Sequence, residues 1–449
     1  MSILTQARQL RLSPPPQTTA ISGILYDPTS FSLALKHPDS SISLYPNISP
    51  FSSPLSLSTS AVTALSPPSS AAAFLHLRST GFSRVMFIVS SPHLAGNYIL
   101  LRFYILGSDK FARVRVCCNN NNNNSNNKSE MFFDEKKFGV LIKVNHGVSV
   151  KVVGSVNVFA LYSVSDSKVR VYAVKSVFGE GDEVKLMKTA VIDCELPVFS
   201  ISVSGGFLML GEENGVRVFN LRTLVKGKVK KFDNKVNVKK VSLVNGMVSD
   251  GGSVLYVKNG KEKIGKHSDN SVKLKPVKMR QNSNEGGVRF VAFKSKEFED
   301  QNSSKVPSMS LKAISIHFLA HNKFLILDSH GELYLLSLSN PNSGSGSTCD
   351  MKKLTLTMKV QNLAVLPDDS TRAQTVWVSD GEYTIHAIIV SDTESPADDN
   401  DTKDIEERLQ SMATKVIFTS EKIQEIIPLA ANAVLLLGQA NNIFAYAIS

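Results

Sequence analysis

Pairs of short apolar strands joined by a polar turn recur along this chain and restrict its fold more than any other feature of the sequence. The clearest pair is FLMLGEENGVRVFNLRT at residues 207–223, and a further apolar strand, VFSISVS, precedes it at 198–204. Apolar and polar residues alternate in these strands, which is the pattern of a β-strand with one face buried. Asn and Gly in the turn supply the positive φ that a tight hairpin requires. The pattern therefore predicts a β-hairpin beside a third strand.

Seven further segments have the same hairpin pattern. They begin at Phe31, Arg84, Val158, Gly246, Lys323, Thr375 and Ala433. Apolar strands that precede hairpins lie at 61–67, 313–320 and 423–431, and more polar candidates for a fourth strand lie at 184–191 and 415–421. Repeated four-stranded units predict an all-β chain that forms one closed β-propeller of four-stranded blades over residues 1–449.

The units resemble the blades of WD-repeat β-propellers. Residues 216–223, VRVFNLRT, stand where that family has the end of its V-x-V-W-D-L-R-T strand. Six of the other units have a ring-bearing residue in the matching place, at Tyr45, Tyr104, Tyr172, Tyr256, His386 and Tyr446, whereas the unit at 323–339 has only aliphatic residues there. The family's Trp-Asp signature and its Gly-His pair are absent, so the hydrogen-bond relay that those residues form in the family is not expected here. The resemblance covers nearly the whole chain and consists of strand pattern.

Eight units are counted, and seven blades result instead if the first or the second unit is a side hairpin. The last unit ends within a strand at Ser449, so closure of the ring requires an outer strand from the N-terminus. Residues 3–11, ILTQARQLR, can supply that strand. The alternative is a cleaved organellar transit peptide, because the first 26 residues contain two arginines and no acid.

Four insertions, near 119–129, 260–306, 340–350 and 391–404, are predicted to be disordered. The first is an Asn tract, the third is rich in Gly and Ser, and the last carries six acids against one lysine. One helix is predicted at 402–413, where Ile405 and Leu409 have i, i+4 spacing.

No motif for a catalytic site, a cofactor or a metal is found, and no enzyme activity is expected. The consecutive residues Asp328, Ser329 and His330 are typical of a turn, because neighbours in a hairpin turn point in different directions. His317 and His321 lie four apart without a third ligand, which favours a core or rim position. Trp377 is expected to pack between blades.

The composition indicates an intracellular protein without membrane spans. Four irregularly spaced cysteines, Cys117, Cys118, Cys194 and Cys349, form no disulfide framework and are expected to be reduced thiols. No apolar run approaches the roughly 18 residues that a membrane-spanning helix needs.

The basic charge of the chain is concentrated in one segment. Residues 226–280 contain 14 Lys and one Arg against four acids, a net charge of +11, which equals the formal net charge of the whole chain. Such a segment can attract nucleic acid or acidic proteins, and it can equally be a solvated strand face. The candidate docking residues for an acidic partner or nucleic acid are Lys228, Lys230, Lys231, Lys239, Lys240, Lys273, Lys275 and Lys278.

These observations predict a non-catalytic protein–protein interaction platform, a scaffold or adaptor subunit of an intracellular complex. Its partners are proteins, with no small-molecule substrate, cofactor or membrane. The alternative is a nuclear RNA-associated or ribosome-assembly-associated propeller that uses the basic segment 226–280. The basic charge favours the nucleus over the cytosol, and organellar targeting follows if the N-terminus is a transit peptide.

Overall fold

In the computed structural model, the regular secondary structure of the described residues is β-strand apart from one short helix and one 3-10 residue. The structure describes residues 4–10, 12, 20–48, 50–51, 62–79, 81–118, 130–145, 147–177, 183–226, 276–283, 287–293, 310–338, 349–366, 373–391 and 412–448. The strands of these residues form seven separate sheets. No helix in the described ranges is long and apolar enough to cross a membrane.

Each sheet is one blade, numbered here from the N-terminal side. Blade 1 contains β2 (Gly23–Asp27), β3 (Ser32–Lys36), β4 (Ile42–Tyr45) and β5 (Thr63–Leu65). Blade 2 contains β6 (Ala71–Ser79), β7 (Phe82–His93), β8 (Tyr98–Leu106), β9 (Phe111–Arg113), β11 (Met131–Asp134) and β12 (Gly139–Lys143). Blade 3 contains β13 (Val150–Gly154), β14 (Val158–Ser163), β15 (Lys168–Val177) and β16 (Glu183–Asp193), with β10 (Arg115–Cys118) and β20 (Val277–Arg280) on its outer edge.

The remaining four blades have four strands each. Blade 4 contains β17 (Ser200–Ser204), β18 (Phe207–Glu212), β19 (Gly215–Asn220) and β21 (Arg289–Ala292), and α1 (Leu221–Lys226) follows β19. Blade 5 contains β22 (Ala313–Ala320), β23 (Lys323–Asp328), β24 (Leu333–Leu338) and β25 (Cys349–Lys353). Blade 6 contains β26 (Asn362–Val365), β27 (Ala373–Ser379), β28 (Thr384–Ser391) and β29 (Met412–Phe418). Blade 7 contains β30 (Ile423–Ala430), β31 (Ala433–Gly438), β32 (Ile443–Ile448) and β1 (Leu4–Gln9).

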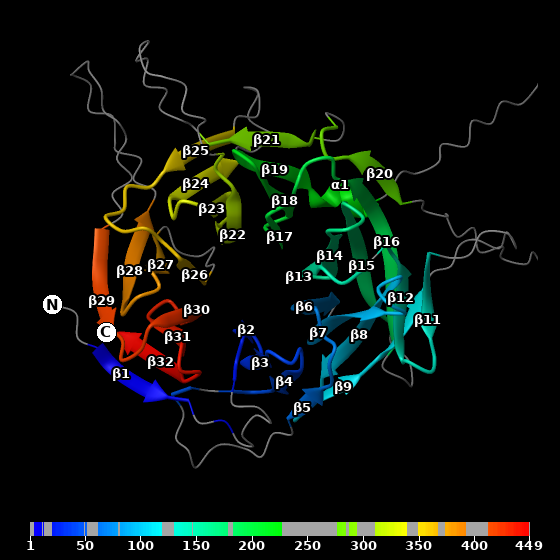
Figure 1. Ribbon diagram of the computed structural model, residues 1–449, viewed down its shortest axis with the longest axis horizontal. Coiled ribbons are helices and arrows are strands. Elements are labelled where there is room, and N and C mark those ends of the chain that lie inside the picture. Colours follow the sequence, from blue (N-terminus) through cyan, green and yellow to red (C-terminus); the bar gives the residue numbers. More distant parts are fainter. Residues whose placement is uncertain are drawn as a thin grey trace, which may run out of the picture.

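The blades stand around one axis, with the first strand of each nearest the centre (Figure 1). One apolar cluster fills each contact between neighbouring blades, including the contact between blades 7 and 1. The alternation along β23 explains this packing: Phe324 and Ile326 face blade 4, whereas Leu325 and Leu327 face blade 6. The fold is a seven-bladed β-propeller, and the predicted propeller of four-stranded blades is confirmed.

The ring is closed by strand pairing between the two ends of the chain. β1 is antiparallel to β32, with Ala7 opposite Tyr446 and Gln9 opposite Phe444. The two chain ends therefore lie at the same blade (Figure 1).

The count of seven arises differently from what the sequence suggests. The first and second units form blades 1 and 2, so the expectation that one of them is a side hairpin is wrong. The unit that begins at Gly246 lies outside the described residues. The segments 61–67, 184–191 and 415–421 contain or overlap β5, β16 and β29, which are outer strands of the blades that precede them in the chain. Each pairs antiparallel with the second strand of the hairpin just before it.

Several predicted insertions and the predicted helix fall partly on described strands. The range 260–306 contains β20 and β21, so its assignment as an insertion is wrong for those residues, which pair with β16 and β19. Residues 119–129, 340–348 and 392–404 lie outside the described residues, whereas Cys349 and Asp350 begin β25 and Ser391 ends β28, so the predicted insertions 340–350 and 391–404 are wrong for these three residues. Of the predicted helix 402–413, residues 402–411 also lie outside them, and Met412 and Ala413 begin β29.

The two faces of the ring differ in which connections they carry. Because the strands within a blade alternate in direction, the connections from first to second strand and from third to fourth strand share one face, called the bottom face here. The connections from second to third strand and from one blade to the next share the top face. α1 follows the third strand of blade 4 and therefore lies at the bottom face.

Candidate binding surface

Of the predicted docking lysines, one lies among the described residues. Lys278 is exposed on β20, at the outer edge of blade 3. The other seven, Lys228, Lys230, Lys231, Lys239, Lys240, Lys273 and Lys275, lie outside the described residues. Their role in docking stays a prediction.

Asp328 and His317, which the sequence analysis singled out, make hydrogen bonds within the fold. The Asp328 carboxylate is buried in the turn between β23 and β24, where it accepts hydrogen bonds from the backbone N–H groups of His330 (2.8 Å) and Glu332 (2.9 Å). His317 is hydrogen-bonded to the Ser315 hydroxyl at 2.6 Å, and burial lowers its pKa to about 4. The predicted turn at 328–330 is confirmed. His317 lies part-buried on β22, and His321 is exposed in the turn that follows this strand. Within the described ranges no group of three or more His, Cys, Asp or Glu could hold a metal ion.

Trp377 is fully buried on β27, in the apolar cluster between blades 6 and 7. The predicted packing between blades is therefore confirmed.

A pocket of about 290 Å³ opens at the bottom face where blades 2 and 3 meet. It is formed by the end of β6, the start of β7, the start of β14, the end of β15 and α1. Its lining residues are Leu77, Arg78, Ser79, Phe82, Arg84, Asn157, Val158, Ala173, Val174, Lys175, Ser176 and Val225. Residues from blade 2, from blade 3 and from α1 thus meet at this pocket.

Asn157 fixes the geometry of the pocket. Its side chain accepts a hydrogen bond from the Arg78 N–H at 2.8 Å and donates one to the Arg78 carbonyl at 2.7 Å. Its own carbonyl accepts a hydrogen bond from the Val174 N–H at 2.8 Å. Asn157 has a φ of 58°, which Asn tolerates better than most residues. Through its side chain and its backbone carbonyl, Asn157 therefore ties the ends of β6 and β15 together across the contact between the blades.

Gly154 allows the inner strands β6 and β13 to approach closely near the pocket. A Cβ atom at Gly154 would lie 2.1 Å from the Phe74 carbonyl oxygen, so any larger residue would push the two strands apart.

The pocket combines positive charge with an apolar interior. Arg78, Arg84 and Lys175 are exposed at its rim, and no acid is among the described residues that line it. Leu77, Val158, Ala173 and Val174 are buried at its base. The Phe82 side chain is 60% exposed and lies beside this apolar base.

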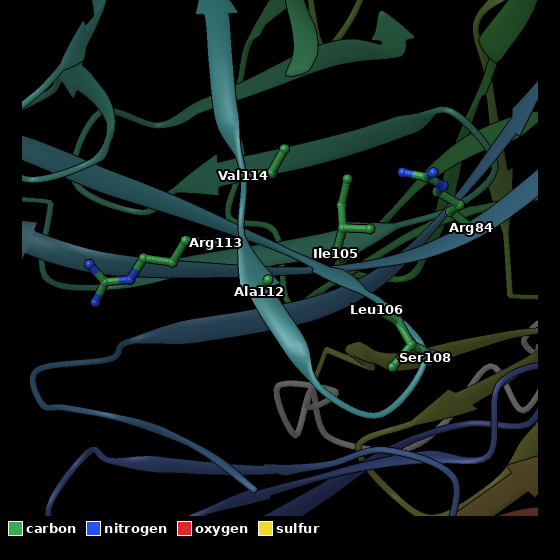
Figure 2. Close-up of a pocket in the computed structure, with 8 residues that line it drawn as sticks. Arg84, Ile105, Leu106, Ser108, Ala112, Arg113 and Val114 are labelled. Carbon is green, nitrogen blue, oxygen red and sulfur yellow. The ribbon is translucent and has the colours of Figure 1, made fainter. Parts of the chain in front are cut away.

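A second pocket of about 330 Å³ adjoins the first, because Arg84 lines both. Figure 2 shows Arg84 and Arg113 on opposite sides of this second pocket, with Ile105, Ala112 and Val114 between them. The Arg113 guanidinium lies 5.9 Å from the centre of the Tyr104 ring, a distance typical of a cation–π contact.

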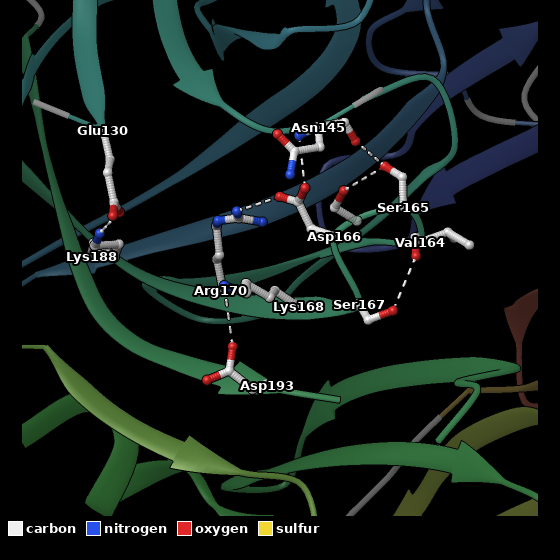
Figure 3. A network of polar contacts seen from close by, with 11 residues as sticks. Glu130, Asn145, Val164, Ser165, Asp166, Ser167, Lys168, Arg170, Lys188 and Asp193 are labelled. Atoms are coloured by element: carbon white, nitrogen blue, oxygen red, sulfur yellow. Dashed lines mark hydrogen bonds and ion pairs between the residues drawn. The ribbon is translucent and has the colours of Figure 1, made fainter. Parts of the chain in front are cut away.

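A polar network joins blades 2 and 3 away from these pockets (Figure 3). The Asp166 carboxylate accepts hydrogen bonds from Arg170 Nη2 at 2.6 Å and from the Asn145 N–H at 2.7 Å. Lys188 Nζ lies 2.5 Å from a Glu130 carboxylate oxygen, and this hydrogen bond lowers the pKa of Glu130. The contact between the two blades is thus held both at Asn157 and at this network.

No local sequence pattern predicts that the pocket residues lie together. Arg78, Phe82, Arg84 and Lys175 lie at strand ends, where isolated polar or aromatic residues are common. Only the packing of blade 2 against blade 3 brings them together.

No protein-family model matches the chain, and no curated protein sequence matches it. Among solved structures, the Cps50 (Swd1) β-propeller domain of Myceliophteria thermophila is similar, with 8% identity, 99% of this chain and 100% of that chain covered, and a TM-score of 0.45. U3-55K is similar at 9% identity, with 98% of each chain covered and a TM-score of 0.41. The WD40 domain of SCAP from fission yeast is similar at 10% identity, with 97% of this chain and 83% of that chain covered and a TM-score of 0.38. The assignment of the fold rests on the sheet order and packing described above.

Proposed function

We propose that the protein is a non-catalytic platform that binds partner proteins at its bottom face. The observation that carries this proposal is the pocket between blades 2 and 3, where three exposed basic side chains surround an apolar interior. Protein interfaces are enriched in Arg and aromatic residues at their centres, and Arg78, Arg84 and Phe82 provide both kinds of group here.

The rest of the ring supports this role by keeping the surface rigid. Apolar clusters fill all seven blade contacts, and β1 closes the ring. A rigid surface loses little conformational entropy on binding, so more of the contact energy appears as affinity. A scaffold or adaptor subunit of a larger complex is the function that fits such a surface.

Affinity purification of the full chain from cells, with quantitative mass spectrometry, tests the proposal. The triple variant Arg78→Glu/Arg84→Glu/Lys175→Glu should lose most of the proteins captured by the wild type. Lys143→Glu is the matched control, because Lys143 is an exposed lysine on β12 that lines neither pocket. Capture by this control should equal that by the wild type.

A parallel purification with nuclease separates the platform from the nucleic-acid-associated alternative. Partners should persist after nuclease treatment if proteins bind the surface directly. Loss of all partners on nuclease treatment, or equal capture by the triple variant and the wild type, would contradict the platform.

A further inference from the structure

We propose that the pocket between blades 2 and 3 binds an acidic linear segment of a partner protein. Carboxylates of the segment contact Arg78, Arg84 and Lys175, and one large apolar side chain of the segment packs beside Phe82. This inference rests on the proposed function, because it assigns a chemistry to the partner that the bottom face binds.

Charge complementarity selects an acidic ligand. Three basic groups surround the pocket, and no described lining residue is acidic. A carboxylate that enters the pocket is therefore attracted by the basic side chains and is not repelled by a described lining acid. Arg222 and Lys226 are exposed on α1, beside the lining residue Val225, and add to the positive potential. Guanidinium groups bind carboxylates through paired hydrogen bonds, which gives geometric selectivity as well as attraction.

The apolar base of the pocket selects a segment that also carries a large apolar residue. Leu77, Val158 and Val174 are buried at the base, and Phe82 and Val225 lie beside them. A volume of about 290 Å³ is at or below the lower end of the range for small-molecule sites, about 300–1,000 Å³. The space suits one side chain of a peptide better than a cofactor.

The same features favour a peptide over nucleic acid. Proteins that bind single-stranded nucleic acid use an extended basic groove with several aromatic rings for stacking. Phe82 is the one aromatic residue among the described residues that line this pocket, and the adjoining pocket has none in its lining.

The pocket is formed before the ligand arrives. Asn157 holds the Arg78 backbone on both its N–H and carbonyl groups, and it also binds the Val174 N–H. The basic side chains therefore start from a fixed backbone, and binding has to order only their outer atoms.

Fluorescence anisotropy with the purified full chain tests the inference. The probe is a labelled peptide of Asp and Glu residues with one central Phe, and two control peptides replace either the Phe with Ser or the acids with Asn and Gln. The wild type should bind the probe, and each control peptide should bind at least about tenfold more weakly, since anchors of this kind each contribute more than 1 kcal/mol. A single-stranded oligouridylate of equal charge completes the set.

Three variants locate the site. The triple variant Arg78→Glu/Arg84→Glu/Lys175→Glu should weaken probe binding by at least about 30-fold, and Lys143→Glu should leave it within about twofold, because distant exposed charges are screened. Phe82→Ser keeps all charges, so it should weaken binding of the probe and leave binding of the Ser control peptide unchanged. Since Phe82 is exposed, this variant should fold even where the triple variant does not, which circular dichroism verifies.

The outcomes separate this inference from the proposed function. Equal probe binding by the wild type, the triple variant and Phe82→Ser would overturn the acidic segment, as would tighter binding of the oligouridylate than of the peptide. If the probe peptide does not bind while capture of cellular partners still depends on Arg78, Arg84 and Lys175, the proposed platform is supported and the proposed acidic segment is contradicted. If neither probe nor partners depend on these residues, both proposals fall.

Discussion

Contacts between blades include buried polar pairs as well as apolar packing. His76 on β6 lies 2.7 Å from the Asp27 carboxylate at the end of β2, and the Ser30 hydroxyl donates to the same carboxylate at 2.6 Å. Burial acts to raise the pKa of Asp27, but these hydrogen bonds outweigh it, so the pKa lies below its ordinary value. The pair joins blades 1 and 2. Because its two residues are 49 positions apart in the sequence, no local pattern predicts it.

Replacing His76 with Ala should lower the free energy of unfolding at pH 7 by about 1–3 kcal/mol, because a partner of the buried Asp27 carboxylate is lost. An acid with a lowered pKa in the folded state stabilises the fold above its unfolded pKa of about 3.9, and this contribution is lost as the pH falls further. The difference between wild type and variant should therefore shrink below about pH 4. Urea unfolding from pH 7 to 3 measures it, with His93→Ala as the control.

The His317 side chain makes a second contribution to pH dependence, which has the same sign as that of Asp27 but lies at higher pH. Its pKa of about 4 in the folded chain lies below the ordinary value of 6.5, so protonation favours the unfolded state. The stabilisation is complete above pH 6.5 and is lost as the pH falls to about 4, with an amplitude on the order of 2–3 kcal/mol. His317→Asn should remove this part of the acid sensitivity. An identical pH dependence of unfolding in the variant and the wild type would contradict the assignment.

At the level of strands, the hairpins and the N-terminal outer strand were predictable, whereas the strands added at the outer edge of blade 3 were not. The hairpin at 207–223 became β18 and β19, with Asn214 in the turn at a φ of 59°, because alternation and turn chemistry act within one short segment. The outer edge of β16 was not predictable. β10 pairs in parallel with its residues 183–186, and β20 pairs in parallel with residues 190–193, and each arrives from another part of the chain. Such additions cover an edge that would otherwise be open to other chains.

The strand β1 makes the clearest prediction at this level. Replacing residues 4–9 with Gly and Ser should destabilise the propeller by about 3–6 kcal/mol, because Gly in a strand costs about 0.5–1 kcal/mol a residue and the side-chain pairs with β32 are lost. Chemical unfolding measures the change, and a variant with six Gly and Ser residues inserted after Met1 is the control. Equal stability of all three proteins would show that pairing of β1 with β32 does not hold the ring closed.

On the scale of the whole molecule, the described strands of the propeller and most of the basic charge lie in different parts of the sequence. All seven sheets are formed by described residues, whereas most of the lysines of segment 226–280 lie outside them. The sequence left eight or seven blades open, and the described residues form seven; the eighth hairpin pattern, at Gly246, lies outside the described residues. Sequence pattern alone could not show that β21, beyond this segment, completes blade 4.

Replacing residues 228–274 with a Gly/Ser linker of about 20 residues should leave the fold intact, since such a linker spans about 25 Å on average. The far-ultraviolet spectrum should stay that of a β-protein, and the melting temperature should change little. In this linker variant, the triple substitution Arg78→Glu/Arg84→Glu/Lys175→Glu should weaken probe binding as it does in the full chain. Loss of the folded spectrum would mean that the segment is part of the propeller.

Hydroxyl-radical footprinting of the full chain, alone and bound to its co-purified partners, tests the bottom-face platform most directly. Phe82 is 60% exposed beside the pocket, and Tyr383 is 47% exposed in a top-face turn, so both rings should be labelled in the free chain. Partner binding should protect Phe82 and leave Tyr383 unchanged. Unchanged labelling of Phe82 in the complex, or protection of Tyr383 alone, would contradict a platform that binds its partners at the pocket between blades 2 and 3.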